Sequence, residues 1–210
     1  MAEPIRGLDP AVVRRNLERV RERCGRQVEI LAATKYVGSA ELPVLAEAGV
    51  ELVGENRLQD LEAKRAEHGD AFVWDFIGAL QSRKVKRILP LVRLIHSVAS
   101  ESALEQLGRH AEPEAEVLVE VELAGEQSKA GIAPNALGEF IARAPVRVSG
   151  LMTMPPATED PERSRPYFAR LAELAAEHRL ERLSMGTSQD WEVAVQEGAT
   201  IIRLGTTLYR

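Results

Sequence analysis

The spacing of apolar residues alternates along the chain between two patterns. In one, apolar residues recur every three or four positions, as in an amphipathic helix; in the other they form short, nearly continuous runs, as in a strand covered on both faces. The predicted helices are 9–24, 39–49, 56–69, 80–91, 100–110, 133–144, 160–178 and 188–198. The predicted strands are 28–34, 50–54, 72–78, 93–98, 115–123, 146–152, 181–186 and 200–205.

Strict alternation of helices and strands favours parallel strands joined by crossover helices. Eight such units without a Pro/Gly/Ser-rich linker predict a single α/β domain over residues 1–210, a (β/α)8 TIM-type barrel. A doubly wound open sheet is the alternative. No helix is predicted after the last strand, so we expect the N-terminal helix, 9–24, to fill that gap in the outer ring.

Composition narrows the class of protein. Hydrophobic residues at 45% and charged residues at 28% are ordinary for a globular chain, and a net charge of -5 argues against binding nucleic acid through its phosphates. Cys24 is the only cysteine, so no internal disulfide forms, which fits a reducing compartment. No run of apolar residues is long enough for a membrane span or a signal peptide. We expect a cytoplasmic protein that binds neither membrane nor nucleic acid.

Polar residues and glycines gather where the predicted strands end, which is where barrels carry their chemistry. They are Thr34-Lys35, Gly54-Glu55-Asn56, Gly78, Gln81, Met152-Thr153, Met185-Gly186-Thr187-Ser188, Arg203, Gly205 and Thr206. This concentration predicts a ligand site at the carboxyl ends of the strands.

The last two loops have the composition of a phosphate site. Ser188 stands at the predicted N-cap of the eighth helix, and Gly205 and Thr206 follow the eighth strand. Barrels often bind phosphate with these two loops, through backbone N–H groups, hydroxyls and a helix N-terminus. The alternative is that Ser188 is only a cap and the glycines are only turn residues.

Lys35 stands out because the chain contains five lysines against 22 arginines. An amine can lose its proton and attack a carbonyl, whereas a guanidinium stays charged. A lysine at one end of a pocket and a phosphate cradle at the other match pyridoxal 5′-phosphate, whose aldehyde forms a Schiff base with lysine. Arg203 could donate to the pyridine nitrogen and keep it unprotonated, which weakens carbanion chemistry. The alternative for Arg203 is a salt bridge at the barrel rim.

Seven ordered segments resemble the pyridoxal phosphate homeostasis protein family over nearly the whole chain. They are "LAATKYV", "GENRLQDLEAK", "WDFIGALQSRKVK", "ELAGEQSKAGI", "GLMTMPP", "LSMGTSQDWEVAVQEGAT" and "IRLGTTLY". The resemblance implies a barrel like the N-terminal domain of alanine racemase, with pyridoxal 5′-phosphate held as an aldimine on Lys35. It also implies that Asn56 lies beside the cofactor, that Ser188, Gly205 and Thr206 hold its phosphate, and that Arg203 lies near the ring nitrogen. With the strand-end residues Met185 and Gly186, these are the candidate cofactor-binding residues.

The chain departs from the family pattern at two positions. Asp75 in "WDFIG" stands where the family usually has His, and Ala99 in "HSVAS" stands where it tends to have Asp. Neither touches the lysine or the phosphate loops, so we expect both to affect the pocket mouth or a partner contact. Lys84 and Lys129 match family positions; they are either outer-face charges or residues with a role in cofactor exchange.

The residues favour a carrier over an enzyme. Two-base racemisation needs a base opposite the lysine, which alanine racemase-like enzymes take from a second domain and a neighbouring subunit, and no second domain is expected here. Tyr36 should point away from Lys35, Tyr209 is terminal, and only His96 among the histidines is at a strand end. We expect a non-catalytic, monomeric protein that buffers pyridoxal 5′-phosphate or delivers it to apo-enzymes. The alternatives are an amino-acid racemase and, without an aldimine, a phosphosugar isomerase.

Overall fold

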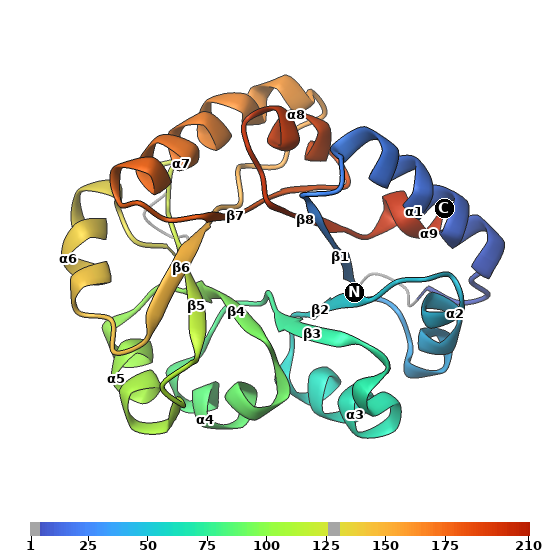
Figure 1. Ribbon diagram of the computed structural model, residues 1–210, viewed down its shortest axis with the longest axis horizontal. Helices are drawn as coiled ribbons and strands as arrows, with labels where there is room; N and C mark the ends of the chain where they lie inside the picture. Colours follow the sequence, from blue (N-terminus) through green and yellow to red (C-terminus); the bar gives the residue numbers. More distant parts are fainter. Residues whose placement is uncertain (1–4, 126–130) are drawn as a thin grey trace.

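Eight parallel strands close into a barrel in the computed structural model, which describes residues 5–125 and 131–210 (Figure 1). The strands are β1 (Glu29–Ala33), β2 (Leu52–Glu55), β3 (Val73–Phe76), β4 (Leu94–Val98), β5 (Glu116–Glu120), β6 (Arg147–Met152), β7 (Arg182–Thr187) and β8 (Ile201–Leu204). The order is sequential, and β8 pairs with β1 through Leu31↔Arg203 and Ala32↔Leu204. The closed barrel is confirmed, and the open-sheet alternative is wrong.

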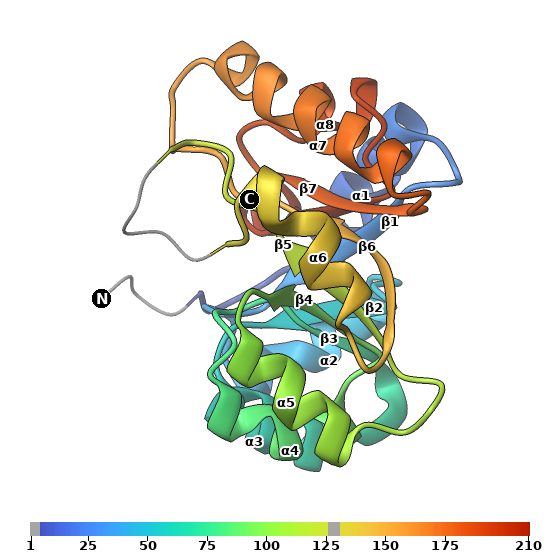
Figure 2. The ribbon, with the colours of Figure 1, turned by 90° about the vertical axis from the view of Figure 1, so that its left-hand side faces the viewer.

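Helices surround the barrel (Figures 1 and 2). The α-helices are α1 (Pro10–Cys24), α2 (Leu42–Glu47), α3 (Leu58–His68), α4 (Val85–Ile88), α5 (Glu101–His110), α6 (Leu137–Ala142), α7 (Arg165–Glu177), α8 (Trp191–Gln196) and α9 (Thr206–Tyr209). Short 3-10 turns are η1 (Ser39–Glu41), η2 (Gly69–Ala71), η3 (Ser82–Lys84), η4 (Leu89–Leu91), η5 (Pro134–Ala136) and η6 (Pro161–Ser164). Within the described part of the chain, no helix combines the length and apolar character needed to cross a membrane.

The N-terminal helix closes the outer ring as expected, but it has a partner there. α1 starts at Pro10 after Asp9, whose carboxylate accepts the Ala11 N–H at 2.8 Å, and it lies beside α9 in Figure 1. The buried Asn16 side-chain amide donates to the carbonyls of Leu208 at 3.2 Å and Arg210 at 3.0 Å. The sequence prediction missed α9 because its single turn has no amphipathic period to detect.

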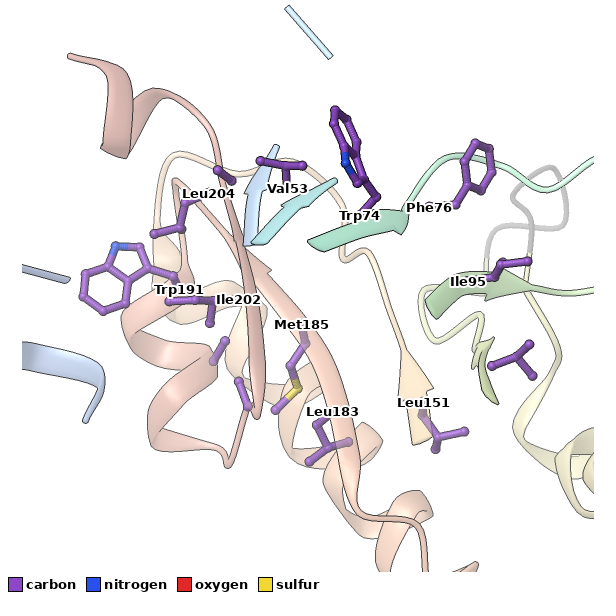
Figure 3. Packing of buried hydrophobic residues seen from close by; sticks show 14 of the residues in the cluster. Val53, Trp74, Phe76, Ile95, Leu151, Leu183, Met185, Trp191, Ile202 and Leu204 are labelled. Atoms are coloured by element: carbon purple, nitrogen blue, oxygen red, sulfur yellow. The ribbon is translucent and has the colours of Figure 1, made fainter. Parts of the chain in front are cut away.

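Buried apolar residues form two layers, one on each face of the sheet. The larger layer lies between the strands and the helices and includes Val53, Trp74, Met185 and Ile202 (Figure 3). The smaller one fills the barrel interior with Leu31, Leu52, Leu94, Leu118, Met152 and Ile201. Alternate residues of a strand face opposite sides, so the polar neighbours of outward-facing residues must point into the barrel.

This alternation places several polar side chains inside. Asp75 lies between the outward-facing Trp74 and Phe76, and Ser184 lies between Leu183 and Met185. The same reasoning directs His96, Glu120 and Arg203 inward. The barrel therefore carries a polar column through an otherwise apolar interior.

Candidate functional site

Lys35 lies in the turn directly after β1, at the carboxyl end of the barrel, and its side chain is exposed. Its Nζ lies 5.1 Å from the centroid of the Tyr36 ring, close enough for a cation–π contact. The expectation that Tyr36 points away from its neighbour is therefore wrong. The backbone N–H of Val37 donates to the carbonyl of Thr34 at 2.8 Å, which closes a turn with Lys35 and Tyr36 at its centre.

A buried ion pair holds this turn from behind. Lys64 of α3 donates to the Glu55 carboxylate at 2.5 Å and to the backbone carbonyl of Thr34 at 2.9 Å. The same carboxylate accepts the Thr34 hydroxyl at 2.6 Å and the backbone N–H of Asn56 at 3.2 Å. Glu55 is fully buried and Lys64 is 6% exposed. The pair thus fixes the backbone on either side of the site, immediately before Lys35 and at Asn56.

The role of Lys64 was not predicted from the sequence. The available signal was that lysine is rare in this chain, which contains five. The same signal singled out Lys35. The signal could not reveal the ion pair, because Glu55 and Lys64 lie on different elements.

Asn56 faces the same cavity as Lys35. The cavity measures about 550 Å³ and is lined by Lys35, Tyr36, Asn56, Arg57 and Lys64, among others. The side-chain oxygen Oδ1 of Asn56 is buried and has no hydrogen-bond partner among the described residues. A buried acceptor without a partner is costly in the absence of a ligand, so this atom points to a donor supplied from outside the chain.

Ser188 joins the loops that follow β7 and β8. Its hydroxyl oxygen accepts the backbone N–H of Gly205 at 3.0 Å and that of Thr207 at 3.2 Å. The expectation that Ser188 caps the helix after β7 is wrong, because Asp190 occupies the position before α8. The Asp190 carboxylate instead accepts the Thr187 N–H at 2.7 Å. Ser188 therefore belongs with Gly205 and the exposed Thr206, as the phosphate-site hypothesis requires.

Met185 and Gly186 are less accessible than their neighbours in this loop. The Met185 side chain is fully buried in the layer beneath the helices, where Figure 3 shows it with Leu183 and Ile202, so only its backbone remains available at the strand end. Gly186 has φ of 89°, and a Cβ there would lie 2.6 Å from the Cβ of Ala194. Glycine is required at this position by the packing of α8 against β7.

Arg203 lies in the barrel interior, below these loops, and is 6% exposed. It donates to the hydroxyl of Ser184 at 2.6 Å, to the carbonyl of Thr153 at 3.0 Å and to the sulfur of Met154 at 3.0 Å. All three are neutral, so the alternative of a salt bridge at the barrel rim is wrong. Burial lowers the pKa of the guanidinium to about 10, at which it is still charged at neutral pH.

Adjacent strands bring these groups to one end of the barrel. The position of a Cβ on Gly205 would lie 4.0 Å from the carbonyl oxygen of Ala33, so the β8 loop touches the strand that leads to Lys35. The hydroxyl of Tyr209 also donates to that carbonyl at 3.1 Å. The structure thus joins the Lys35 turn, the Asn56 loop and the Ser188–Gly205 contact.

The remaining candidates lie elsewhere. Asp75 is fully buried inside the barrel, so it does not itself line the pocket mouth. Ala99 is half-buried after β4, and Lys84 is half-buried just before α4. Lys129 lies outside the described residues.

Comparison with known proteins shows which class of protein has this fold and this arrangement. Residues 8–210 match the family model described as "Alanine racemase, N-terminal domain". An alanine racemase from Corynebacterium glutamicum superimposes with a TM-score of 0.74 at 16% identity, over 96% of this chain and 61% of that one. At that identity the likeness extends to the fold alone.

More similar relatives identify the family. The pyridoxal phosphate homeostasis protein of Aquifex aeolicus is 39% identical over 93% of this chain and 94% of its own length. PipY of Synechococcus elongatus, solved with PLP bound, has a TM-score of 0.84 at 32% identity over 94% of this chain and 100% of its own. The chain belongs to the pyridoxal phosphate homeostasis protein family.

Proposed function

We propose that this protein binds pyridoxal 5′-phosphate at the carboxyl end of its barrel and takes part in intracellular vitamin B6 homeostasis without catalysing amino-acid turnover. The observation that carries the proposal is that Lys35 and the unpartnered Asn56 oxygen face one cavity at the carboxyl end of the barrel, while β8, which pairs with β1, leads to the Ser188–Gly205 contact at the same end. PipY, a relative of similar length, was solved with this cofactor bound.

Lys35 supplies the covalent link. Its unprotonated amine attacks the cofactor aldehyde, a C=N bond forms, and the aldehyde oxygen leaves as water. The exposed side chain of Lys35 can reach an incoming aldehyde, and the turn behind it is fixed by Glu55 and Lys64. Asn56 Oδ1 accepts a hydrogen bond within the same cavity.

The loops after β7 and β8 hold the phosphate. The backbone N–H groups of Gly205 and Thr207 already converge on one oxygen atom, the hydroxyl of Ser188. A phosphate oxygen attracts the same donors more strongly because it is charged. Thr206 is exposed beside them and adds a hydroxyl donor. Met185 and Gly186 contribute backbone at the start of this loop.

Arg203 faces the cofactor ring. Three of its N–H groups have protein acceptors, which leaves the Nε–H and one Nη1–H without a partner among the described residues. Such a donor, directed at the ring nitrogen, keeps that nitrogen unprotonated, so the ring withdraws electrons less. This property suits storage of the cofactor better than carbanion chemistry.

Absorption spectra of the purified protein with pyridoxal 5′-phosphate test the proposal. Wild type should acquire the visible band of a Schiff base, and Lys35→Ala should not, while Lys86→Ala, at an exposed position of α4, serves as the matched lysine control. Borohydride reduction should fix the cofactor mass on Lys35. A wild-type spectrum showing only free cofactor would contradict the proposal and favour a phosphosugar isomerase.

One observation favours the second candidate, a racemase. Glu120 ends β5, four strands around the barrel from β1, and burial raises the pKa of its carboxyl to about 7 despite the attraction of Arg203. A carboxylate of that pKa can act as a base. Incubation of the loaded protein with L-alanine in D2O decides: loss of the α-proton at a rate that falls in Glu120→Gln would support racemisation. The carrier proposal expects no exchange above that of free cofactor.

Delivery and oligomeric state complete the proposal. We expect a monomer that releases its cofactor to apo-enzymes in transient encounters. Analytical ultracentrifugation measures the oligomeric state. Delivery is measured by the rate at which an apo-enzyme regains activity when the loaded protein is added. That rate should exceed the rate at which the cofactor dissociates from the loaded protein; equal rates would show that the cofactor is only released into solution.

A further inference from the structure

A chain of buried polar side chains runs through the barrel behind Arg203. Arg203 donates to the Ser184 hydroxyl at 2.6 Å, which lies 2.8 Å from Nδ1 of His96. The other ring nitrogen, Nε2, lies 3.1 Å from Oδ2 of Asp75. Asp75 accepts two bonds from Arg93, at 3.1 and 2.7 Å, near the opposite end of the barrel. Asp75, His96 and Ser184 are at most 2% exposed. These hydrogen bonds form an unbroken chain from Arg203 to Arg93.

The donors and acceptors along this chain have one consistent assignment. The carboxylate of Asp75 only accepts, so the His96 ring donates to it from Nε2. A neutral ring carries one proton, so Nδ1 accepts and the Ser184 hydroxyl donates to it. The lone pairs of Ser184 are then left for Arg203, because a guanidinium only donates.

The electrostatics of the interior agree with this assignment. Burial lowers the pKa of His96, although the Asp75 carboxylate opposes the shift, so the ring is neutral. Burial alone would raise the pKa of Asp75, but the hydrogen bonds from His96 and Arg93 hold it below its ordinary value. The charged groups acting on His96 are Asp75, Arg203 and Arg93. The ring thus connects a carboxylate to a hydroxyl without carrying charge itself.

Stability alone does not account for such a chain. Apolar side chains fill the same interior from six strands, and replacing buried ionic groups by packed apolar ones is often neutral or stabilising. The chain is also continuous up to Arg203, whose remaining N–H donors lack protein acceptors among the described residues.

We propose that Asp75, His96 and Ser184 are positioning residues that orient Arg203 toward the ring nitrogen of the bound pyridine cofactor. This inference rests on the proposed function and deepens it. Ser184 holds one arm of the guanidinium, His96 fixes the direction of the Ser184 hydroxyl, and Asp75 fixes the tautomer of His96. The side chain at position 75, within the barrel, thereby influences the electronic state of a ligand at its mouth.

The first test needs no cofactor. Nitrogen NMR of the histidine rings in the apoprotein, with His96 assigned by its absence from His96→Asn, should show a neutral ring protonated at Nε2 at pH 7. A ring protonated at Nδ1, or at both nitrogens, would overturn the inference, because Ser184 could then not donate to it. This result is independent of whether the protein binds pyridoxal 5′-phosphate.

The second test uses the loaded protein and a matched pair of interior variants. Ser184→Ala removes one buried oxygen beside Arg203, and Ile201→Val removes one buried methylene from the same strand as Arg203. We expect Ser184→Ala to shift the visible band of the bound cofactor or the pH midpoint of that band, and to weaken binding about tenfold. Ile201→Val should change neither.

The outcomes separate the two proposals. An unchanged band and affinity in Ser184→Ala, or equal changes in both variants, would overturn the positioning role while borohydride still fixes the cofactor on Lys35. No visible band in wild type would overturn the proposed function and this inference with it. If Ser184→Ala does not fold, the tautomer of His96 in the wild-type apoprotein decides.

Discussion

At the scale of single residues, Glu55 holds together three groups beside the candidate site. Its buried carboxylate is bonded to Lys64, to the Thr34 hydroxyl and to the Asn56 backbone. Glu55→Gln leaves the Lys64 ammonium buried without a counter-charge, so we expect a loss of about 3 kcal/mol in the free energy of unfolding and much weaker formation of the Lys35 Schiff base.

Urea unfolding and cofactor titration measure both effects. Glu62→Gln is the matched control, because Glu62 pairs with Arg87 on the surface, where an ion pair is worth about 1 kcal/mol or less. Equal losses in the two variants would show that the buried Glu55–Lys64 pair stabilises the protein no more than the surface Glu62–Arg87 pair does.

Glu120 should make stability depend on pH. Its pKa is raised to about 7 in the folded protein by burial, above the ordinary value of a glutamate, so the folded state binds the proton more tightly than the unfolded chain. The carboxyl therefore destabilises the fold progressively as pH rises from about 4.5 to 7. Glu120→Gln should unfold at the same temperature as wild type at pH 4 and several degrees higher at pH 8.

Thermal unfolding across that range checks the prediction, with a gain of about 2 kcal/mol expected at pH 8. A gain of the same size at pH 4 and pH 8 would mean that the carboxyl does not titrate in this window.

At the scale of elements, the contact between β7 and α8 depends on Gly186. Both Gly186 and Gly198 have positive φ, of 89° and 92°. A Cβ on Gly186 would lie 2.6 Å from the Cβ of Ala194, whereas the nearest atom to one on Gly198 is 3.9 Å away. We expect Gly186→Ala to cost about 2 kcal/mol more than Gly198→Ala, because only the first adds a collision to the backbone strain.

Denaturant midpoints of the two variants measure that difference, and the cofactor affinity of Gly186→Ala should fall as the Ser188 loop shifts. Equal losses of stability in Gly186→Ala and Gly198→Ala would show that backbone strain alone, without the collision with Ala194, accounts for the effect.

The elements also show what the sequence could predict. All eight strands appear within a few residues of their expected bounds, because apolar runs between glycines and caps are local signals. The orientations of Ser188 and Tyr36 were mispredicted, since both depend on contacts with the rest of the site rather than on sequence spacing. The interior chain through Asp75 was missed for the same reason: its members lie on four strands.

At the scale of the whole molecule, the first and last helices close the barrel. The side-chain amide of Asn16 in α1 donates hydrogen bonds to the carbonyls of Leu208 and Arg210. The hydroxyl of Tyr209 donates a hydrogen bond to the carbonyl of Ala33 at the end of β1. We expect Asn16→Ala to lower the free energy of unfolding by about 1–3 kcal/mol and to weaken cofactor binding, because α9 carries Thr206 and Thr207.

Asn135→Ala, at an exposed position of η5, is the matched control and should leave both quantities unchanged. Cofactor affinity that stays at the wild-type value in Asn16→Ala would show that the α1–α9 contact serves the fold alone.

The pairing of β1 with β8 has a consequence for biosynthesis. Lys35 emerges from the ribosome long before β8, whose pairing with β1 closes the barrel. Under the proposed function, a nascent chain of seven strands offers the amine without the loop after β8 that would hold the phosphate. We therefore expect uptake of the cofactor to wait until β8 has been made and the barrel has closed.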